Sequence, residues 1–250
     1  MGLIGGFSMI NEMSDMEKEF KEAVASIKVE RGLSNLDLFK EKVEDAFGDI
    51  TPIPHISFGN KKVAGTTAIF NTGSWFLCPG RLYGFCDLCE QCNMKFREVM
   101  GSALQSRFNN ELWYRLNDAK TVADFIIASI MVEEFKGCKI DLVRFNSVGD
   151  FRNQADLLKM RDISNVIYKN IGVESYVYTH NENINYKVSR PHLTVNGSGF
   201  MVDNQFTVVS PEDYADYVAT HDCRECYQDC EKCGSICKYK LGEEIVGVLK

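Results

Sequence analysis

The placement of the cysteines constrains this chain more than any other feature. Nine of its ten cysteines fall in two short windows, residues 78–92 (CPGRLYGFCDLCEQC) and residues 223–237 (CRECYQDCEKCGSIC). Thiolates two or three residues apart can bind one metal centre, whereas disulfides between such near neighbours would close strained, very small loops. The pattern therefore predicts two metal sites.

Either of two kinds of metal centre fits these spacings. Iron–sulfur clusters accept closely spaced thiolates with a more remote fourth ligand, and we expect one or two [4Fe-4S] clusters. Zinc is the alternative in each window, because two CxxC pairs can form a closed tetrahedron. His221, just before the second window, could also contribute, and Cys92 and Cys237 are each either a ligand or a spare thiol. The candidate ligands are Cys78, Cys86, Cys89, Cys92, Cys223, Cys226, Cys230, Cys233 and Cys237.

Composition narrows the class of protein. The 250 residues are 45% hydrophobic, which is enough for a sizeable core, and carry a net charge of -7. The acidic balance disfavours a broad nucleic-acid-coating surface but leaves a local basic groove possible. No run of residues is apolar enough to span a bilayer, and the N-terminus lacks the basic start of a secretory signal, so we expect a cytoplasmic protein without disulfides. Cys138, alone outside the windows, is expected to be a buried core thiol.

Hydrophobic periodicity predicts an α/β protein. Residues 1–50 form a helical extension, residues 51–220 alternate strands with helices, and residues 221–250 form a Cys-rich segment packed on the rest. A long helical region at 93–136 should split near Asn117, and further helices are expected over 153–169 and 211–221. Short apolar strands linked by helices are typical of a parallel sheet, here a partial (β/α) barrel ending in a Cys-rich knuckle. The expected strands are 66–70, 139–146, 173–179, 192–197, 205–210 and 243–250.

Polar groups follow several of these strands, where parallel sheets gather functional residues. His180 and Asn181 are the catalytic candidates; His180 could be a general acid or base, or equally a loop histidine. His55 and His192 each adjoin a proline and are expected to be structural. Arg144 lies inside an apolar strand and should need a partner.

A resemblance to a known family rests on several motifs. FGNKKVAGTTAIFNTGSWFLCPG, LVRFNSVGDFRNQ and YVYTHNE, followed by the Cys-rich tail, resemble the phage "gene product 88" family over residues 56–240. The function of that family is unassigned. The resemblance implies an origin in a phage, a prophage or a mobile element.

A second, weaker resemblance is to radical S-adenosylmethionine (SAM) enzymes. Cys78, Cys86 and Cys89 follow the strand TTAIF, as the three cluster ligands of those enzymes follow their first strand, although the x7 spacing departs from the usual x3. The resemblance implies that Gly149 and Asp150 bind the SAM amine. Asp150 could instead cap the following helix. Cys92 could close the cluster as a fourth ligand, leaving no open iron for SAM.

By the same resemblance, Asn181 and Asn196 stand where polar groups meet the ribose and carboxylate of SAM. The leading interpretation is an iron–sulfur, radical-SAM-like enzyme that cleaves SAM reductively and abstracts hydrogen from an unknown substrate. The alternative is a non-catalytic zinc- or cluster-stabilised binding protein, with nucleic acid as its candidate partner.

Overall fold

The computed structural model describes residues 3–25, 44–59, 65–86, 103–147, 149–226 and 234–248, with side chains from residue 11 to 22 in the first segment. Contacts divide the chain into two compact units. The helical unit comprises Met1–His55, Asn71–Asp118 and Val148–Asp150, and the sheet unit comprises Ile56–Phe70, Ala119–Ser147 and Phe151–Lys250. In these described segments, every helix is too short or too polar to cross a membrane.

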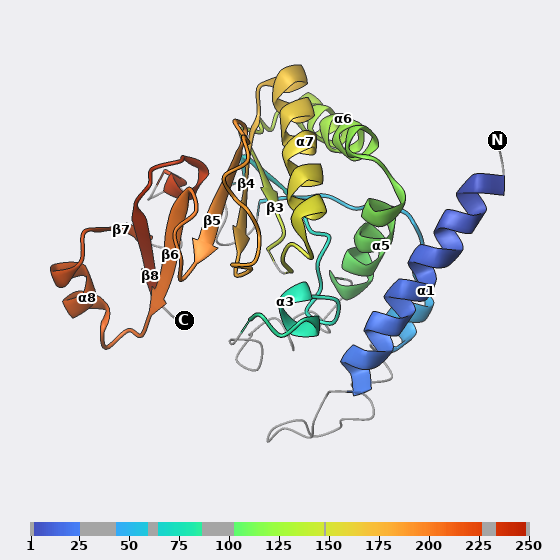
Figure 1. Ribbon diagram of the computed structural model, residues 1–250. Helices are drawn as coiled ribbons and strands as arrows, with labels where there is room; N and C mark the ends of the chain where they lie inside the picture. Colours follow the sequence, from blue (N-terminus) through green and yellow to red (C-terminus); the bar gives the residue numbers. More distant parts are fainter. Residues whose placement is uncertain are drawn as a thin grey trace. The chain divides into compact units, whose positions relative to one another are not determined.

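The sheet unit confirms the predicted α/β class. Within the described residues eight strands form one sheet in the order β1-β2-β3-β4-β5-β6-β8-β7, and all neighbours are parallel except β1 and β2 (Figure 1). The strands are β1 (Ser57–Phe58), β2 (Thr67–Phe70), β3 (Leu142–Phe145), β4 (Glu174–Thr179), β5 (Leu193–Ser198), β6 (Asn204–Val209), β7 (Cys223–Cys226) and β8 (Glu244–Val248).

Helices of the sheet unit pack on each other and on the central strands. They are α6 (Ala119–Phe135), α7 (Gln154–Ile171), α8 (Tyr214–Thr220) and the single 3-10 turn η2 (Ile236–Lys238). Figure 1 shows α7 beside α6, and α7 contacts the strands β4 and β5. The stripe Leu157, Ile163 and Ile167 of α7 is fully buried, as expected for an amphipathic helix that covers a sheet.

The N-terminus of α7 is capped by Asn153, whose side chain accepts hydrogen bonds from the N–H groups of Ala155 (2.9 Å) and Asp156 (3.2 Å). Asp150 therefore does not cap this helix. At the other end, Gly172 adopts a left-handed conformation (φ 68°) and its N–H donates to Tyr168, which is a common way for a helix to end.

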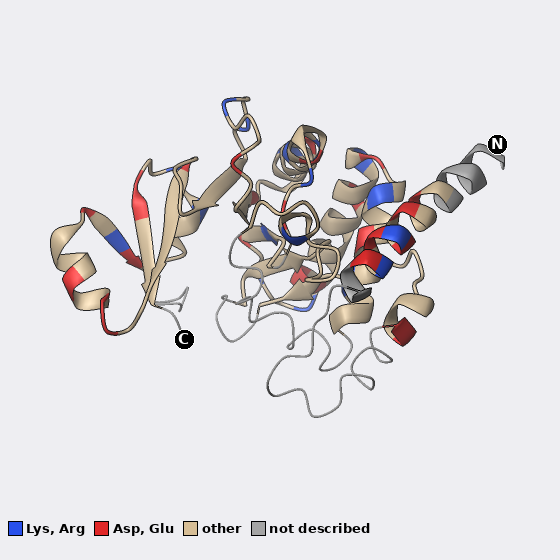
Figure 2. Ribbon diagram, turned by 60° about the horizontal axis from the view of Figure 1, so that its bottom comes forward, with Lys and Arg blue, Asp and Glu red and all other residues tan. Residues whose placement is uncertain are grey.

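The helical unit has an aromatic core. It contains α1 (Leu3–Ala25), a short helix at 44–48, α3 (Pro79–Leu82) and α5 (Ala103–Leu116). Phe20 stacks on Phe47 at 4.1 Å between ring centroids, and Phe108 meets both rings edge-on. Arg115 of α5 forms ion pairs of 2.7 Å with Glu19 of α1 and Glu111, and Figure 2 shows that α1 carries both acidic and basic residues.

Several sequence predictions can be compared with these elements. The helical region does split, between Leu116 and Ala119, and six of the observed strands fall within or next to predicted ones. Cys138 is exposed, at the turn between α6 and β3, so the prediction of a core thiol was wrong. Cys138 comes directly after Gly137, whose left-handed backbone (φ 94°) lies in the turn between α6 and the buried strand β3.

Two predictions were incomplete or lie outside the described residues. The sequence pattern missed β7, because Cys223–Cys226 was interpreted only as a metal motif. The centre of the Cys-rich knuckle, residues 227–233, and residues 26–43 of the predicted helical extension lie outside the described residues.

Candidate functional site

The first cysteine window begins in the segment that follows β2. Residues Trp75, Phe76 and Leu77 are buried and anchor this segment in the helical unit. Cys78 then precedes the single-turn helix α3, in which Pro79 occupies the first position, where a missing N–H costs nothing. The carbonyl of Cys78 accepts hydrogen bonds from the N–H groups of Arg81 (3.1 Å) and Leu82 (3.0 Å), which fixes the turn.

This turn brings Cys78 and Cys86 to the same point. The N–H of Cys86 donates to the carbonyl of Gly80 at 3.1 Å. A Cβ atom built on Gly80 would lie 2.9 Å from the Cβ of Cys86 and 3.6 Å from the Sγ of Cys78. Glycine is thus required where the two cysteine side chains converge, and the long x7 spacing is closed by one helical turn. Cys89 and Cys92 lie outside the described residues.

Trp75 and Arg81 lie beside this pair of cysteines. The guanidinium carbon of Arg81 is 4.1 Å from the centroid of the Trp75 ring, a cation–π contact. Trp75 is only 3% exposed. The positive charge of Arg81 therefore packs against a buried aromatic ring, three residues on either side of Cys78 in the sequence.

Gly149 approaches the same segment of chain. It adopts φ 92°, and a Cβ atom at this position would lie 2.7 Å from the Cα of Gly73. Gly73 stands five residues before Cys78, so the loop with Gly149 and Asp150 packs against the segment that leads into the first window, all within the helical unit. The structure thus brings together two motifs that are about 70 residues apart in the sequence.

The other predicted polar residues lie in the sheet unit. Asn181 is buried; its Nδ2 donates to the carbonyl of Phe151 (3.0 Å) and its Oδ1 accepts from the N–H of Asn183 (3.0 Å). Asn196 is fully buried, and its Nδ2 donates to the carbonyls of Val177 (3.3 Å) and Cys237 (3.0 Å). These contacts give both amides a role in holding loops to the sheet.

The histidines have varied surroundings. His180 is half-buried at the end of β4. His192 stacks on Tyr168 with 3.6 Å between ring centroids, and the backbone of His55 is held by both ends of the Asn110 amide (2.6 and 2.8 Å). These contacts support structural roles for His55 and His192. His221 ends α8 and stacks on Tyr217, 3.9 Å away.

The second window is divided between the two faces of a strand. Cys223 and Cys226 lie three residues apart on β7, and side chains alternate along a strand, so they point to opposite faces. Cys226 packs with Cys237 of η2 in an apolar cluster that includes Tyr176 and Ile245. Cys230 and Cys233 lie outside the described residues. Among the residues that are described, no three His, Cys, Asp or Glu side chains form a group that could hold a metal ion.

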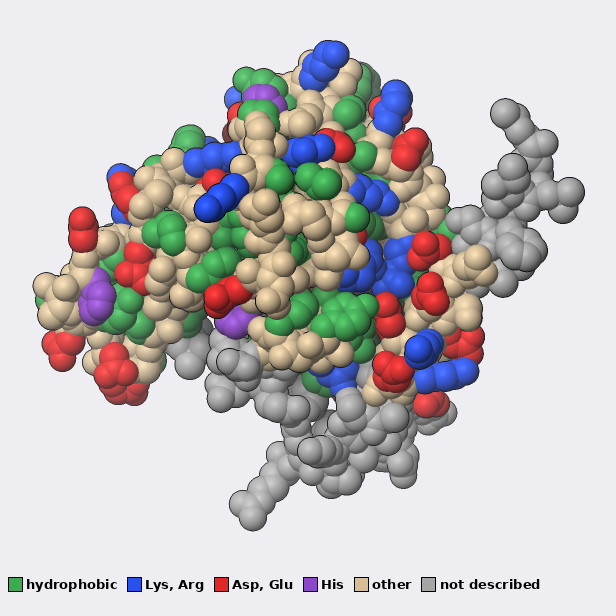
Figure 3. All heavy atoms as spheres, in the orientation of Figure 1, with side chains coloured by type: hydrophobic (Ala, Val, Ile, Leu, Met, Phe, Trp, Pro, Cys, Tyr) green, Lys and Arg blue, Asp and Glu red, His purple; other side chains and the backbone are tan. Residues whose placement is uncertain are grey.

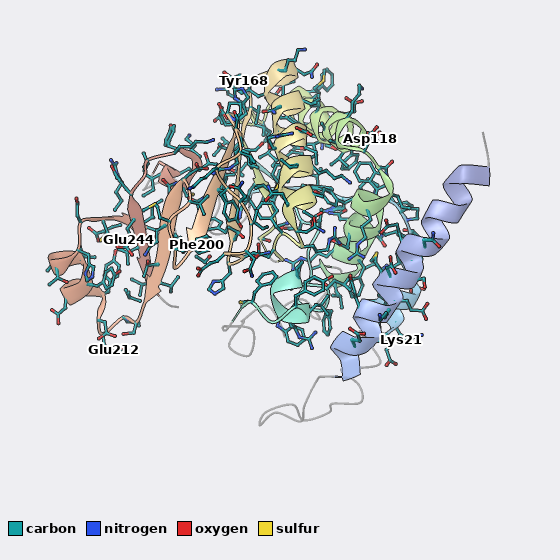
Figure 4. All side chains as sticks on the ribbon, in the orientation of Figure 1. Lys21, Asp118, Tyr168, Phe200, Glu212 and Glu244 are labelled. Carbon is teal, nitrogen blue, oxygen red and sulfur yellow. The ribbon has the colours of Figure 1, made fainter. Side chains whose placement is uncertain are left out.

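Cys223 lies on the acidic face of β7. Burial, and then the carboxylates of Glu244, Glu225 and Asp222, raise the pKa of its thiol. Glu244 (labelled in Figure 4) accepts hydrogen bonds through Oε1 from Gln205 (3.0 Å), the Tyr217 hydroxyl (2.9 Å) and Thr207. Acidic side chains also gather around α8 (Figure 3). This environment favours the protonated form of the Cys223 thiol.

Arg144 lies on the face of the sheet that carries Cys226. Its guanidinium carbon lies 5.4 Å from the ring centroid of Tyr178 and 6.0 Å from that of Tyr176. Loss of hydration at its hydroxyl, and then the nearby Cys237, raises the pKa of Tyr178 well above its ordinary value, whereas Arg144 acts in the opposite direction. The sequence indicated that Arg144 needs a partner, but strand alternation alone did not identify the two tyrosines.

Comparison with known proteins adds no assignment. The chain matches no family model, and no curated protein or solved structure is significantly similar to it. The function must therefore be argued from the geometry and chemistry of the residues themselves.

Proposed function

We propose that the chain is an iron–sulfur protein whose first window holds a [4Fe-4S] cluster. The observation that carries the proposal is the convergence of Cys78 and Cys86 at Gly80, in the segment that follows strand β2. Cys89 completes the ligand set by its spacing in the sequence, and Cys92 is a possible fourth ligand. The buried ring of Trp75 and the positive charge of Arg81, both close to Cys78 in the sequence, support a site for an anionic, oxygen-sensitive cluster.

We further propose a radical-SAM-like activity within a partial (β/α) barrel. The parallel order β2-β3-β4-β5, with α7 packed along it, is compatible with such a barrel. The contact of Gly149 with Gly73 supports a site in which the Gly149–Asp150 backbone and carboxylate hold the amine of SAM near the first window. When bound, the cluster supplies an electron for reductive cleavage of SAM, which leads to hydrogen abstraction from a substrate.

The second window would hold an auxiliary centre. Cys226 and Cys237 share one apolar cluster and are the described thiols that suit it, and the spacing adds Cys230 and Cys233. Cys223 points to the other face of β7, so a centre that uses Cys226 in this conformation does not also use Cys223.

The test is anaerobic reconstitution with iron and sulfide, followed by elemental analysis, visible absorbance and EPR with and without SAM. We expect Cys78→Ser and Cys86→Ser each to lose about four irons per chain. Cys138→Ser is the matched control, because this exposed cysteine lies outside both windows, and it should keep the full iron content.

Each outcome separates one part of the proposal from the rest. An EPR signal that SAM leaves unchanged would remove the SAM-dependent activity and leave a cluster protein. Colourless protein that contains zinc and no sulfide, even after purification without oxygen, would instead favour the zinc-stabilised binding protein.

A further inference from the structure

Arg144 is a charged residue on a sheet face where its nearest described neighbours include aromatic residues. In the strand register, Arg144 of β3 pairs with Tyr176 of β4, which in turn pairs with Thr194 of β5. The next residues on this face are Tyr178 and, on β6, Phe206, whose rings meet edge-on with 5.1 Å between centroids. The guanidinium is therefore surrounded mainly by aromatic side chains.

One buried nitrogen atom of Arg144 is left without a hydrogen bond by the described residues. Its Nε atom is buried, and within the described residues it has no hydrogen-bond partner. Buried polar nitrogen atoms are nearly always hydrogen-bonded in folded proteins, so such an atom calls for an explanation. Its contacts with Tyr176 and Tyr178 engage the face of the guanidinium and leave the N–H groups at its edge available.

Arg144 forms no ion pair with any of the described residues. Other arginines of the sheet unit are paired: Arg152 with Asp156, Arg190 with Asp203, and Arg224 with Glu243. No carboxylate of a described residue lies within 4.0 Å of the Arg144 guanidinium. The residue is nevertheless only half-buried, so part of its side chain is exposed.

We propose that Arg144 is the anchor of a binding site for a small organic anion, a carboxylate or a phosphate ester. The planar fork of a guanidinium binds either group through two parallel hydrogen bonds, and a charged acceptor would satisfy Nε. Tyr176 and Tyr178 hold the guanidinium in place, and Tyr178 and Phe206 offer apolar contact to the carbon part of the ligand. The site uses β3, β4 and β6 only and does not depend on a metal in either window.

The test is calorimetric titration and thermal unfolding of the full chain in phosphate-free buffer, with benzoate and inorganic phosphate as separate probes. We expect at least one probe to bind and to raise the unfolding temperature of the wild type. Arg144→Met should weaken that binding at least tenfold, and Arg144→Lys should weaken it less because the charge remains. The probe that binds distinguishes a carboxylate from a phosphate ligand.

Arg224→Met is the matched control, because Arg224 lies on the same sheet face but is paired with Glu243; it should bind the probe like the wild type. Equal binding by the wild type and Arg144→Met would overturn the proposal, and so would failure of both probes to bind the wild type. If Arg144→Met does not fold, the comparison of Arg144→Lys with the wild type decides, since unchanged affinity would exclude the guanidinium as the anchor. Repeating the titration before and after reconstitution separates this site from the proposed cluster.

Discussion

Gly149 shows how one residue can join two distant motifs. Its left-handed backbone and its approach to Gly73 both exclude a side chain. Glycine is needed here for two reasons. Its left-handed backbone disfavours any side chain, and the neighbouring Gly73 leaves no room for one. Asp150 follows directly in the chain, and the cap of the next helix is Asn153.

Replacing Gly149 by alanine should therefore destabilise the helical unit by about 2–5 kcal/mol, since left-handed strain and overpacking add. Gly84→Ala is the matched control, because Gly84 has φ 70° in the same unit but nothing lies within 4 Å of its Cβ position; it should cost about 1–2 kcal/mol. Urea unfolding of the metal-free proteins gives both values. Equal losses in the two variants would show that the contact with Gly73 contributes nothing.

The helix α7 illustrates how an element is bounded by local chemistry. Asn153 satisfies two N–H groups at its start, and Gly172 ends it. Both signals are visible in the sequence, and the burial of one stripe then holds the helix on the sheet. The start of the helix is thus independent of Asp150.

Asn153→Ala should lower the free energy of unfolding of the sheet unit by about 0.5–2 kcal/mol, because two N–H groups lose their acceptor. Asn170→Ala is a suitable control: this exposed residue lies near the end of the same helix and donates only to the carbonyl of Val166, so its change should stay within about 0.5 kcal/mol. Urea unfolding followed by circular dichroism measures both. A larger loss in Asn170→Ala than in Asn153→Ala would contradict the capping role.

The chain as a whole has two cores. The aromatic core of the helical unit contains Phe20, Phe47 and Phe108, while Phe145 is fully buried in the sheet unit. Because the chain divides into two compact units, each with its own buried aromatic residues, we expect the units to open separately under native conditions.

Phe108→Ala should remove about 3–5 kcal/mol from the helical unit by leaving a cavity. Amide hydrogen exchange followed by mass spectrometry should then show faster exchange mainly in 103–116 and less change in the strands. Phe145→Ala is the reciprocal variant and should accelerate exchange mainly in the sheet. If both variants accelerate exchange equally everywhere, the chain unfolds as one cooperative unit.

Much of the fold could be predicted from local patterns. The split of the long helical region, the buried strands around Val143 and Val177, and the helix after Asn153 all follow from periodicity and capping, which act over a few residues. The cysteine spacing likewise indicated metal-binding chemistry, which stays a prediction; the structure places Cys78 and Cys86 next to Gly80.

Other features depend on contacts between residues far apart in the chain. The sequence could not show that Gly73 meets Gly149, that Arg144 lies against Tyr176 and Tyr178, or that Cys138 is exposed. The CxxC of the second window is the clearest case: in a turn its sulfurs would converge, but pairing with β8 makes the segment a strand and directs Cys223 and Cys226 to opposite faces. Spacing determines which sulfurs can meet only once the backbone conformation is known, and here partners distant in the sequence determine that conformation.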